Sequence, residues 1–235
     1  MTFRKAERKT AKLRLAITGA ARSGKTYSAL LIAIGLGGKI AMIDTENGSG
    51  DLYSELGDYD ICSLNPPYDP RRYIQLIHEA EQAAYDTIII DSLTHAWNGQ
   101  GGILDLQSKV TEAKYKGNSY NAWREVTPLQ NRLVDAILAS PCHIIATMRS
   151  KTEYLQSLNE RGRTEIRKVG LAPVQREGID YEFAVVFDLS AEHLASVSKD
   201  RTRLFDGNIF NITSDTGNVL RSWLDGNNTK EVNNA

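Results

Sequence analysis

The sequence predicts an α/β fold in which a mostly parallel central sheet is flanked by helices and extended by antiparallel hairpin strands. Unbroken apolar runs alternate with helical segments, at residues 13–18, 39–44, 86–91 and 142–148. Such runs are typical of parallel strands that are covered on both faces and joined by right-handed crossovers. After residue 180 the apolar runs follow one another too closely for helices, which predicts antiparallel strands over 181–190, 193–202 and 208–212.

The predicted helices are marked by their start signals. Asp69 followed by Pro70 opens a helix that runs to about Ala84, and a short helix is expected over residues 217–224. A further helix opens at Thr127 and Pro128, with one apolar face formed by Leu129, Leu133 and Ile137. Two long segments, 93–126 and 149–180, are predicted to be irregular, and loops of that length are often functional.

Length and charge predict one domain with two short extensions. The 235 residues and 41% hydrophobic content suit one large α/β domain, which is predicted over residues 13–224. It is preceded by a basic arm, residues 1–12, and followed by a polar tail, residues 225–235, which is expected to be disordered. The net charge of −1 excludes a uniformly basic nucleic-acid coat, so any polyanion must bind at local patches.

Cysteine usage and hydropathy predict a soluble cytoplasmic protein without a membrane partner. Cys62 and Cys142 lack the spacing of a metal site and suit reduced residues in a cytosol. The longest apolar run is far shorter than the ~18 residues that a membrane-spanning helix needs.

A phosphate-binding loop follows the first predicted strand. "GAARSGKT" matches the pattern GxxxxGKT between a strand and a helix. In this pattern backbone N–H groups wrap the phosphates, the lysine reaches the β- and γ-phosphates, and the threonine hydroxyl contacts Mg²⁺. ATP and Mg²⁺ are therefore the predicted cofactors. The predicted nucleotide-binding residues are Gly19, Ala20, Ala21, Arg22, Ser23, Gly24, Lys25, Thr26 and Tyr27.

Two acids complete the predicted site. Asp91 ends an apolar strand and is expected to orient an Mg²⁺-bound water beside Thr26. Many ring ATPases place a glutamate directly after this aspartate, but that position here is Ser92. We therefore expect Glu46, beyond the neighbouring strand, to activate the attacking water. The alternative is that Asp44 or Glu46 caps the next turn.

Four segments in order, "GAARSGKT", "IDTE", "IIIDS" and "IIATMRSK", resemble the RecA-like recombinase and helicase core over residues 13–212. The resemblance implies that Glu46 is the general base and that a γ-phosphate sensor falls on Thr147, with Arg149 nearby. The chain looks most like the short phage-encoded RecA-like ATPases proposed to act in single-strand annealing and recombination. That likeness implies single-stranded DNA as a partner, assembly into a ring or filament, and a single-strand binding protein as a further partner.

The same resemblance places DNA binding on the two long segments. The first combines cations with aromatic side chains, which suits phosphate neutralisation and base stacking. Within the second, residues 149–176 hold seven cations against three acids. The alternative is a surface helix and a solvated loop. The predicted nucleic-acid residues are Lys114, Lys116, Tyr120, Arg161, Arg163, Arg167 and Lys168.

Two further predictions concern contacts between subunits. "SKDR" matches a Lys-x-Arg element that related helicases and recombinases insert into the neighbouring subunit's site, which falls on Lys199 and Arg201. Phe3 and Ala6 match an FxxA pattern through which some recombinases join protomers, although a free basic arm is the alternative.

Two other function classes remain open at this point. A small-molecule P-loop kinase would use residues 149–176 as a lid over a phosphate acceptor. A nucleotide-switched assembly factor would associate in response to ATP without DNA.

Overall fold

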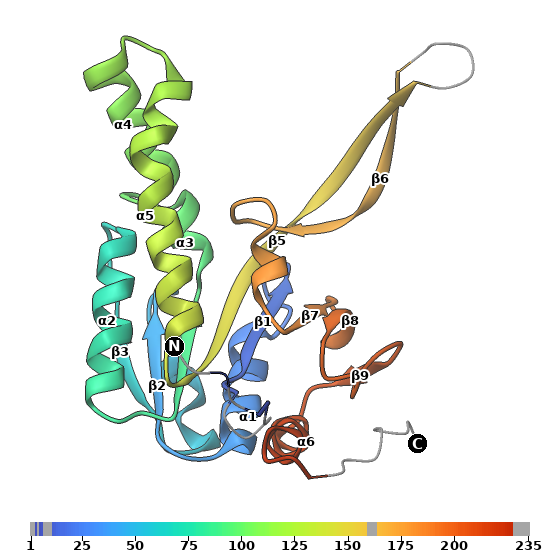
Figure 1. Ribbon diagram of the computed structural model, residues 1–235. Helices are drawn as coiled ribbons and strands as arrows, with labels where there is room; N and C mark the ends of the chain where they lie inside the picture. The colour runs from blue at the N-terminus through green and yellow to red at the C-terminus, as the bar shows by residue number, and fades with distance from the viewer. Residues whose placement is uncertain (1–2, 4, 7–10, 159–163, 228–235) are drawn as a thin grey trace.

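The computed structural model describes residues 3, 5–6, 11–158 and 164–227, and within residues 152–171 it describes the backbone alone. The described residues form one nine-stranded sheet with the strand order β3-β2-β4-β5-β1-β7-β8-β9, and β6 pairs with an extension of β5 (Figure 1). This arrangement confirms the predicted fold class, an α/β P-loop fold with a mostly parallel sheet, flanking helices and antiparallel strands near the C-terminus.

Six strands of the sheet run parallel and bring their carboxyl ends to the same edge. Asp44 and Asp91 stand opposite each other at the ends of neighbouring strands, and Gly19 stands opposite Arg149 on another pair. The parallel strands are β1 (Arg14–Gly19), β2 (Ile40–Asp44), β3 (Asp60–Ser63), β4 (Thr87–Asp91), the first part of β5 (His143–Leu158) and β7 (Val185–Leu189). The antiparallel strands are β6 (Thr164–Pro173), β8 (Leu194–Asp200) and β9 (Ile209–Asn211).

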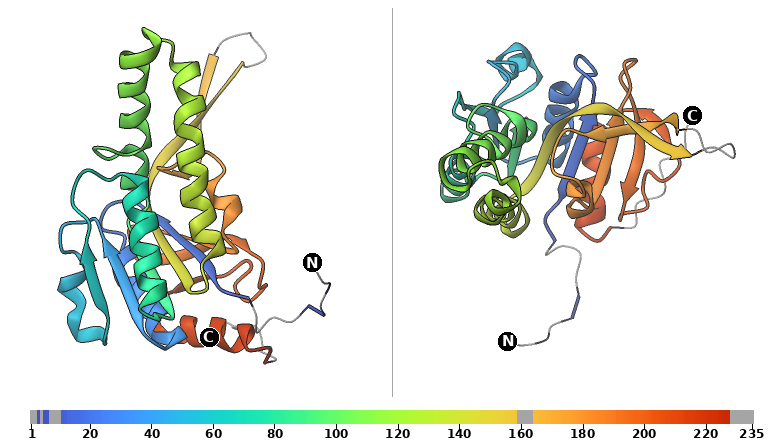
Figure 2. Two further views of the ribbon diagram at one scale, coloured as in Figure 1. Left: turned by 60° about the vertical axis from the view of Figure 1, so that its left-hand side comes forward. Right: turned by 90° about the horizontal axis from the view of Figure 1, so that it is seen from above.

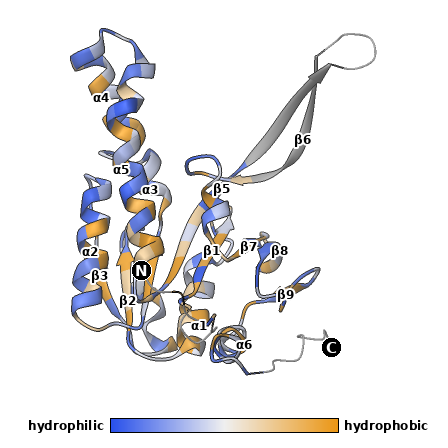
Figure 3. Ribbon diagram, in the orientation of Figure 1, coloured by the Kyte–Doolittle hydropathy of each residue, from blue (hydrophilic) through white to orange (hydrophobic). Residues whose placement is uncertain are grey.

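Helices cover both faces of the sheet, and its strand β2 is coloured mostly as hydrophobic in Figure 3. The buried apolar residues fall into one large cluster on each face. Helices α1 (Lys25–Leu36) and α6 (Ser214–Leu224) pack on one face, where alternate β1 residues such as Leu15 and Ile17 point. Helices α2 (Pro70–Gln82) and α5 (Ser119–Ala139) pack on the other face, together with the short helix η3 (Ile179–Glu182). Helix η2 (Gly50–Leu56) follows β2, while α3 (Thr94–Asn98) and α4 (Ile103–Tyr115) follow β4.

Helices α1 and α6 cross through a pair of glycines. A Cβ at Gly35 would lie 2.0 Å from the Ser214 carbonyl oxygen, and a Cβ at Gly217 would lie 2.2 Å from the Ile32 carbonyl oxygen. Because backbone meets backbone at this crossing, any larger side chain would separate the two helices. Among the residues that the structure describes, no helix is both long and apolar enough to cross a membrane.

The first predicted irregular segment, residues 93–126, is wrong, because it is mainly helical. Helix α5 begins at Ser119, with the Asn118 side chain accepting from the Asn121 N–H, and not at Thr127. Pro128 lies inside the helix, so it does not mark the start. The buried residues Ala122 and Val126 already continue the later apolar stripe at helical spacing, and this was the sequence signal for the true start.

The second predicted irregular segment, residues 149–180, is also wrong. Strand β5 continues to Leu158, ten residues beyond the expected end at 148, and returns as β6 in an antiparallel ladder. The segment is mostly polar in sequence, so it lacks the unbroken apolar run that signals a buried strand. Figures 1 and 2 show this β5–β6 arm and the α4–α5 helical hairpin rising from the same side of the sheet.

Smaller elements differ in extent. Helix α2 begins at Pro70 as predicted, with the Asp69 carboxylate accepting from the Arg71 N–H, whereas α6 begins three residues before the predicted 217. The short, largely exposed edge strand β3 was not predicted, since it lacks an apolar run. Of the expected disordered tail, residues 225–227 form a turn and 228–235 lie outside the described residues.

Candidate nucleotide site

The phosphate-binding loop joins β1 to α1 at the carboxyl edge of the sheet. Gly24 has a φ of 86° directly before the first helical residue, a left-handed conformation that favours glycine. The loop opens onto a cavity of about 390 Å³, lined on this side by Ala21, Arg22, Gly24, Lys25 and Thr26. The first turn of α1 carries no acidic residue, so its N–H groups favour an anion at this position.

A buried hydrogen-bond network holds Asp91 at the end of β4. Thr26 Oγ1 donates to Asp91 Oδ2 at 2.6 Å and lies 3.1 Å from Ser49 Oγ. Thr147 Oγ1 donates to the other carboxylate oxygen of Asp91. Because Asp91 is 1% exposed and both its oxygens are bonded, its position relative to the loop is fixed.

Glu46 faces the same cavity from beyond β2. Arg149 contacts both oxygens of its carboxylate, with Nε 3.1 Å from Oε1, and the Ser92 hydroxyl donates to Oε1 at 3.1 Å. Arg149 is itself fixed through its backbone, since its N–H donates to Thr94 Oγ1 at 2.9 Å and its carbonyl accepts from the Val174 N–H at 2.6 Å. The acid that we predicted as the base is therefore tied to the foot of the β5–β6 arm.

Electrostatics separate the two acids. Burial raises the pKa of Asp91, against the hydrogen bonds from Thr147 and Thr26. Burial also acts to raise the pKa of Glu46, but the hydrogen bonds and charge of Arg149 outweigh it and hold that pKa below its usual value. Burial lowers the pKa of Lys25, against the attraction of Asp91 and Glu46. Glu46 is thus ionised near neutral pH.

Not all of the predicted loop residues line the cavity. Gly19 and Ala20 do not, and Ser23 is fully buried with a hydroxyl that has no hydrogen-bond partner among the described residues. A Cβ at Gly19 would lie 2.3 Å from Ser23 Oγ, so this glycine is needed for the loop to fold back on itself. Lys25 Nζ donates to the Ala20 carbonyl at 2.7 Å.

Thr147, the predicted γ-phosphate sensor, does not line the cavity. It is fully buried and its hydroxyl is used on Asp91, so it positions that carboxylate instead of contacting a ligand. Arg149 does line the cavity, with its side chain 47% exposed, and is the better placed of the two for contact with a terminal phosphate.

A second cavity of about 590 Å³ adjoins the first and shares Arg22, Gly24 and Tyr53 with it. Tyr27, predicted as a nucleotide-binding residue, lines this second cavity, with its ring 5.4 Å from the ring of Tyr53 in an edge-on arrangement. The sequence did not reveal Tyr53 or His193, because they come from η2 and from the β7–β8 turn, far from the loop in sequence.

Sequence reasoning also missed the polar residues behind Glu46. Thr45 Oγ1 lies 2.8 Å from His95 Nδ1 and accepts from the Ser92 N–H at 2.8 Å, and the peptide between Asp91 and Ser92 is cis. His95 Nε2 lies 4.0 Å from Glu46 Oε1. Burial lowers the pKa of His95, against the attraction of Glu46, which keeps the ring neutral at pH 7. A lone histidine after a strand gave no signal of this contact.

The predicted DNA-binding residues that the structure describes lie on the α4–α5 hairpin and on the β5–β6 arm, within helices and strands except for Lys116. Lys114 lies on α4, where it donates to Glu125 of α5 at 2.7 Å, Lys116 ends that helix, and Tyr120 at the start of α5 is 79% exposed. Arg167 and Lys168 lie on β6, for which only the backbone is described. Arg161 and Arg163 lie outside the described residues.

Lys199 and Arg201 lie at the opposite end of the sheet from their own phosphate-binding loop. Val185, at the amino end of β7, pairs with Asp200, whereas the loop end of β7 pairs with Ala195. Lys199 Nζ donates to the carbonyls of Asp180 and Tyr181, at 3.2 and 2.6 Å. The pair therefore cannot reach the phosphate site of its own chain.

The residues of the site suit Mg²⁺. Thr26, Ser49 and Asp91 bring three oxygen-bearing side chains together, and oxygen is the donor that Mg²⁺ prefers. Thr26 and Asp91 would hold the ion, and the ion would supply charge neutralisation between the β- and γ-phosphates.

A family model described as an AAA domain matches residues 11–222, almost the whole chain. The chain therefore belongs to the AAA domain family and has a P-loop AAA-type ATPase core. A search of the curated proteins found no match.

Proposed function

We propose that this protein is an Mg²⁺-dependent ATPase that binds single-stranded DNA and acts in recombination or strand annealing as a homo-oligomer in the cytoplasm. The observation that carries the proposal is the arrangement of Lys25, Thr26, Asp91 and Glu46 around one cavity beside a complete phosphate-binding loop. These groups supply a phosphate cradle, a metal-binding pair and a carboxylate for water activation.

The adjoining cavity of about 590 Å³ is the proposed binding site for the nucleoside of ATP. It continues from the phosphate cavity past Gly24 and carries the aromatic walls of Tyr27 and Tyr53, which suit a flat base. His193 and Asn211 add polar groups at its far side. ATP then spans both cavities, with its phosphates on the loop.

Hydrolysis follows from the position of Glu46. Its carboxylate lines the same cavity as Lys25. The carboxylate is ionised near neutral pH, because its pKa lies below the usual value. It takes a proton from the attacking water. The Glu46 carboxylate must then separate from Arg149 during the reaction cycle, because a carboxylate that accepts two hydrogen bonds from a guanidinium is a weak base.

The two arms support DNA binding. Both rise from the edge of the sheet that carries the nucleotide site (Figure 1), and their sequences carry the cations and aromatic residues predicted from the resemblance. Arg149 stands at the foot of the β5–β6 arm and contacts Glu46, so a ligand that moves this arm changes the environment of the base. This connection gives DNA a route to stimulate turnover.

Assembly is supported by the position of Lys199 and Arg201. Since they cannot reach their own phosphate site, a role in phosphate chemistry requires a neighbouring subunit in a head-to-tail contact. Phe3 and Ala6 are exposed, and Phe3 makes no apolar contact that buries it, so both are accessible to another chain.

The test is ATP hydrolysis measured with and without single-stranded DNA across a salt series, with Lys25→Ala as the inactive control. We expect turnover to rise with DNA and the stimulation to fall steeply with salt, because phosphate contacts release counterions. Unchanged turnover together with no DNA binding at low salt would contradict the DNA-binding function. ATP-dependent association under those conditions would instead identify an assembly factor.

Mixing two inactive proteins tests the shared site. Arg201→Ala lacks the cation that enters the neighbour, and Lys25→Ala lacks a working phosphate site. A mixture restores part of the turnover if Arg201 acts between subunits, because some interfaces then join two intact halves. No recovery in a mixture shown to co-assemble would contradict this role.

A further inference from the structure

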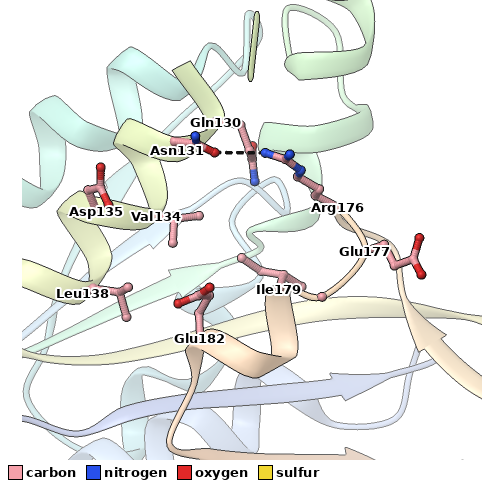
Figure 4. A pocket seen from close by; sticks show the side chains of 10 residues that line it. Gln130, Asn131, Val134, Asp135, Leu138, Arg176, Glu177, Ile179 and Glu182 are labelled. Atoms are coloured by element: carbon pink, nitrogen blue, oxygen red, sulfur yellow. Dashed lines mark hydrogen bonds between the residues drawn. The ribbon is translucent and has the colours of Figure 1, made fainter. Parts of the chain in front are cut away.

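A separate hollow lies on the face of the sheet opposite α1, away from both cavities of the nucleotide site. It has a volume of about 430 Å³ and lies between α5 and the turn and helix η3 that precede β7 (Figure 4). Val134, Leu138 and Ile179 form its apolar part, and polar side chains surround them. Nothing in the proposed ATPase cycle uses this hollow.

One buried polar group in its lining has no partner. Gln130 is 1% exposed, and its Nε2 donates to Gln175 Oε1 at 3.1 Å, which fixes the carboxamide. Gln175 is held in turn, with its Nε2 donating to the Leu93 carbonyl at 3.0 Å. Gln130 Oε1 is left without a hydrogen bond from any described residue. A buried acceptor of this kind calls for a donor.

The rest of the polar lining is also rich in acceptors. The carboxylates of Asp135, Glu177 and Glu182 make no hydrogen bond or ion pair with any residue that the structure describes, although Lys199 stands near enough to Glu182 for its charge to be felt. The one cation of the lining, Arg176, donates to Asn131 Oδ1 at 3.0 Å (Figure 4). The lining thus holds three carboxylates and a single guanidinium that is already engaged with Asn131.

We propose that this hollow is a docking site for the basic N-terminal arm of a second copy of the chain. Lysine and arginine side chains carry only donors, and they complement a lining of unused acceptors. Residues 1–12 hold Arg4, Lys5, Arg8, Lys9 and Lys12 against the single acid Glu7. The long aliphatic stems of these side chains suit the apolar part of the hollow.

A second copy fits better than the arm of the same chain. Phe3, Lys5 and Ala6 are all exposed, and Phe3 is exposed as fully as in an extended chain, so the described part of the arm does not lie in its own hollow. The arm leaves the fold beside the hollow, since Leu138 lines the hollow and also shares a pocket with Lys12. An arm that starts so close to the hollow can pass to the same site on a neighbouring copy. A contact between the arm of one copy and a different surface of the next is heterologous, and such contacts build rings or filaments.

The direct test is binding of a fluorescent peptide of residues 1–12 to the full-length protein, measured by anisotropy without nucleotide or DNA. We expect saturable binding that weakens with salt and loses at least about tenfold in affinity in the double variant Asp135→Asn, Glu182→Gln. The exposed acid Glu112 on α4 provides the matched control, Glu112→Gln, which keeps full affinity. No binding at low salt, or equal binding by all three proteins, overturns the proposal. Because the assay needs no ATP, its outcome is independent of the proposed ATPase function.

Two full-length variants decide which copy the arm enters. One replaces Arg4, Arg8 and Lys9 by glutamine, and the other is the double variant in the hollow. Each should associate less than the unmodified protein in sedimentation at low salt. Mixing the two variants should restore association into a dimer, because one partner supplies an intact arm and the other supplies an intact hollow. Failure to form any such pair, with the peptide still bound, identifies docking within one chain and overturns the second-copy assignment.

Discussion

The two ends of the parallel sheet both bury charged side chains, but they use them differently. At the amino end, the 7% exposed guanidinium of Arg14 donates to the carbonyls of Leu13, Leu138, Ser140 and Cys142. At the carboxyl end, Lys25 and Glu46 line a cavity. The partner of Lys25 is a loop carbonyl, and the partner of Glu46 is the half-exposed side chain of Arg149.

The comparison separates structural from functional burial of charge. Arg14 donates four hydrogen bonds to carbonyls that lie before β1, at the end of α5 and before β5, so its charge stabilises the fold. Lys25 and Glu46 face space that a ligand can fill, so their charges remain available for chemistry. Changes at the carboxyl end should therefore alter turnover, and changes at the amino end should alter stability.

The largest expected effect is that of Glu46→Gln on turnover. The carboxamide keeps the size of the side chain and can accept from Ser92, but it cannot take a proton from water. We expect hydrolysis to fall by about 10²–10³-fold while nucleotide affinity stays within about threefold. Hydrolysis and binding of a fluorescent ATP analogue measure the two effects.

The control for this prediction is Glu55→Gln, which removes an exposed acid of η2 that lines neither cavity of the nucleotide site. It should hydrolyse ATP normally. If Glu46→Gln does so as well, another base activates the water and the contrast between the two ends loses its main support.

Arg14→Met tests the amino end. Removing the guanidinium leaves buried carbonyls without donors, and we expect a loss of about 3 kcal/mol in the free energy of unfolding. Turnover per folded molecule should be unchanged. Urea denaturation measures the loss, and Arg124→Met on the exposed side of α5 is the control, expected to change stability by less than about 0.5 kcal/mol.

The sheet was predictable because apolar runs and strand-end acids carry local signals. The loop residues could be placed from the GxxxxGKT motif. Asp91 and Glu46 could be placed from their positions after two apolar strands, since parallel strands bring their carboxyl ends together. Tyr53, His95 and His193 could not, because each is a single residue that enters the site from a separate segment. The β5–β6 arm was missed since its sequence lacks an unbroken apolar run, and α5 was misjudged because Pro128 was taken as a start signal.

His143 gives a smaller effect on stability, again at the amino end. Its Nδ1 accepts from the Leu13 N–H at 2.9 Å, and burial, with the nearby charges of Lys12 and Arg14, lowers its pKa to about 4. The unfolded chain takes up this proton at about pH 6.5, so the native state loses stability as the pH falls from there toward 4. At pH 5 the loss from this residue is roughly 2 kcal/mol.

Comparison with His143→Asn isolates this contribution from the titration of the acids. The asparagine oxygen can accept from Leu13 but has no proton to take up between pH 4 and 7. The unfolding free energy of the variant should therefore fall less between pH 7 and pH 5. Parallel curves for the two proteins would contradict the assignment.

At the carboxyl end, Arg149→Ala is expected to change turnover less than Glu46→Gln does, and its effect measures how far the site depends on this ion pair. The Arg149 side chain is half exposed, so its pairing with Glu46 is screened, and we expect the rate at pH 7 to change by less than about tenfold. The pKa of Glu46 should rise, because burial is no longer opposed by the guanidinium. The acid limb of the pH–rate profile then moves to higher pH, which a merely structural role for Arg149 does not predict.

The same variant tests the connection between the β5–β6 arm and Glu46. If DNA no longer stimulates turnover while DNA affinity is unchanged, Arg149 transmits the effect of DNA from the arm to the base. If the stimulation is unchanged, another residue transmits it.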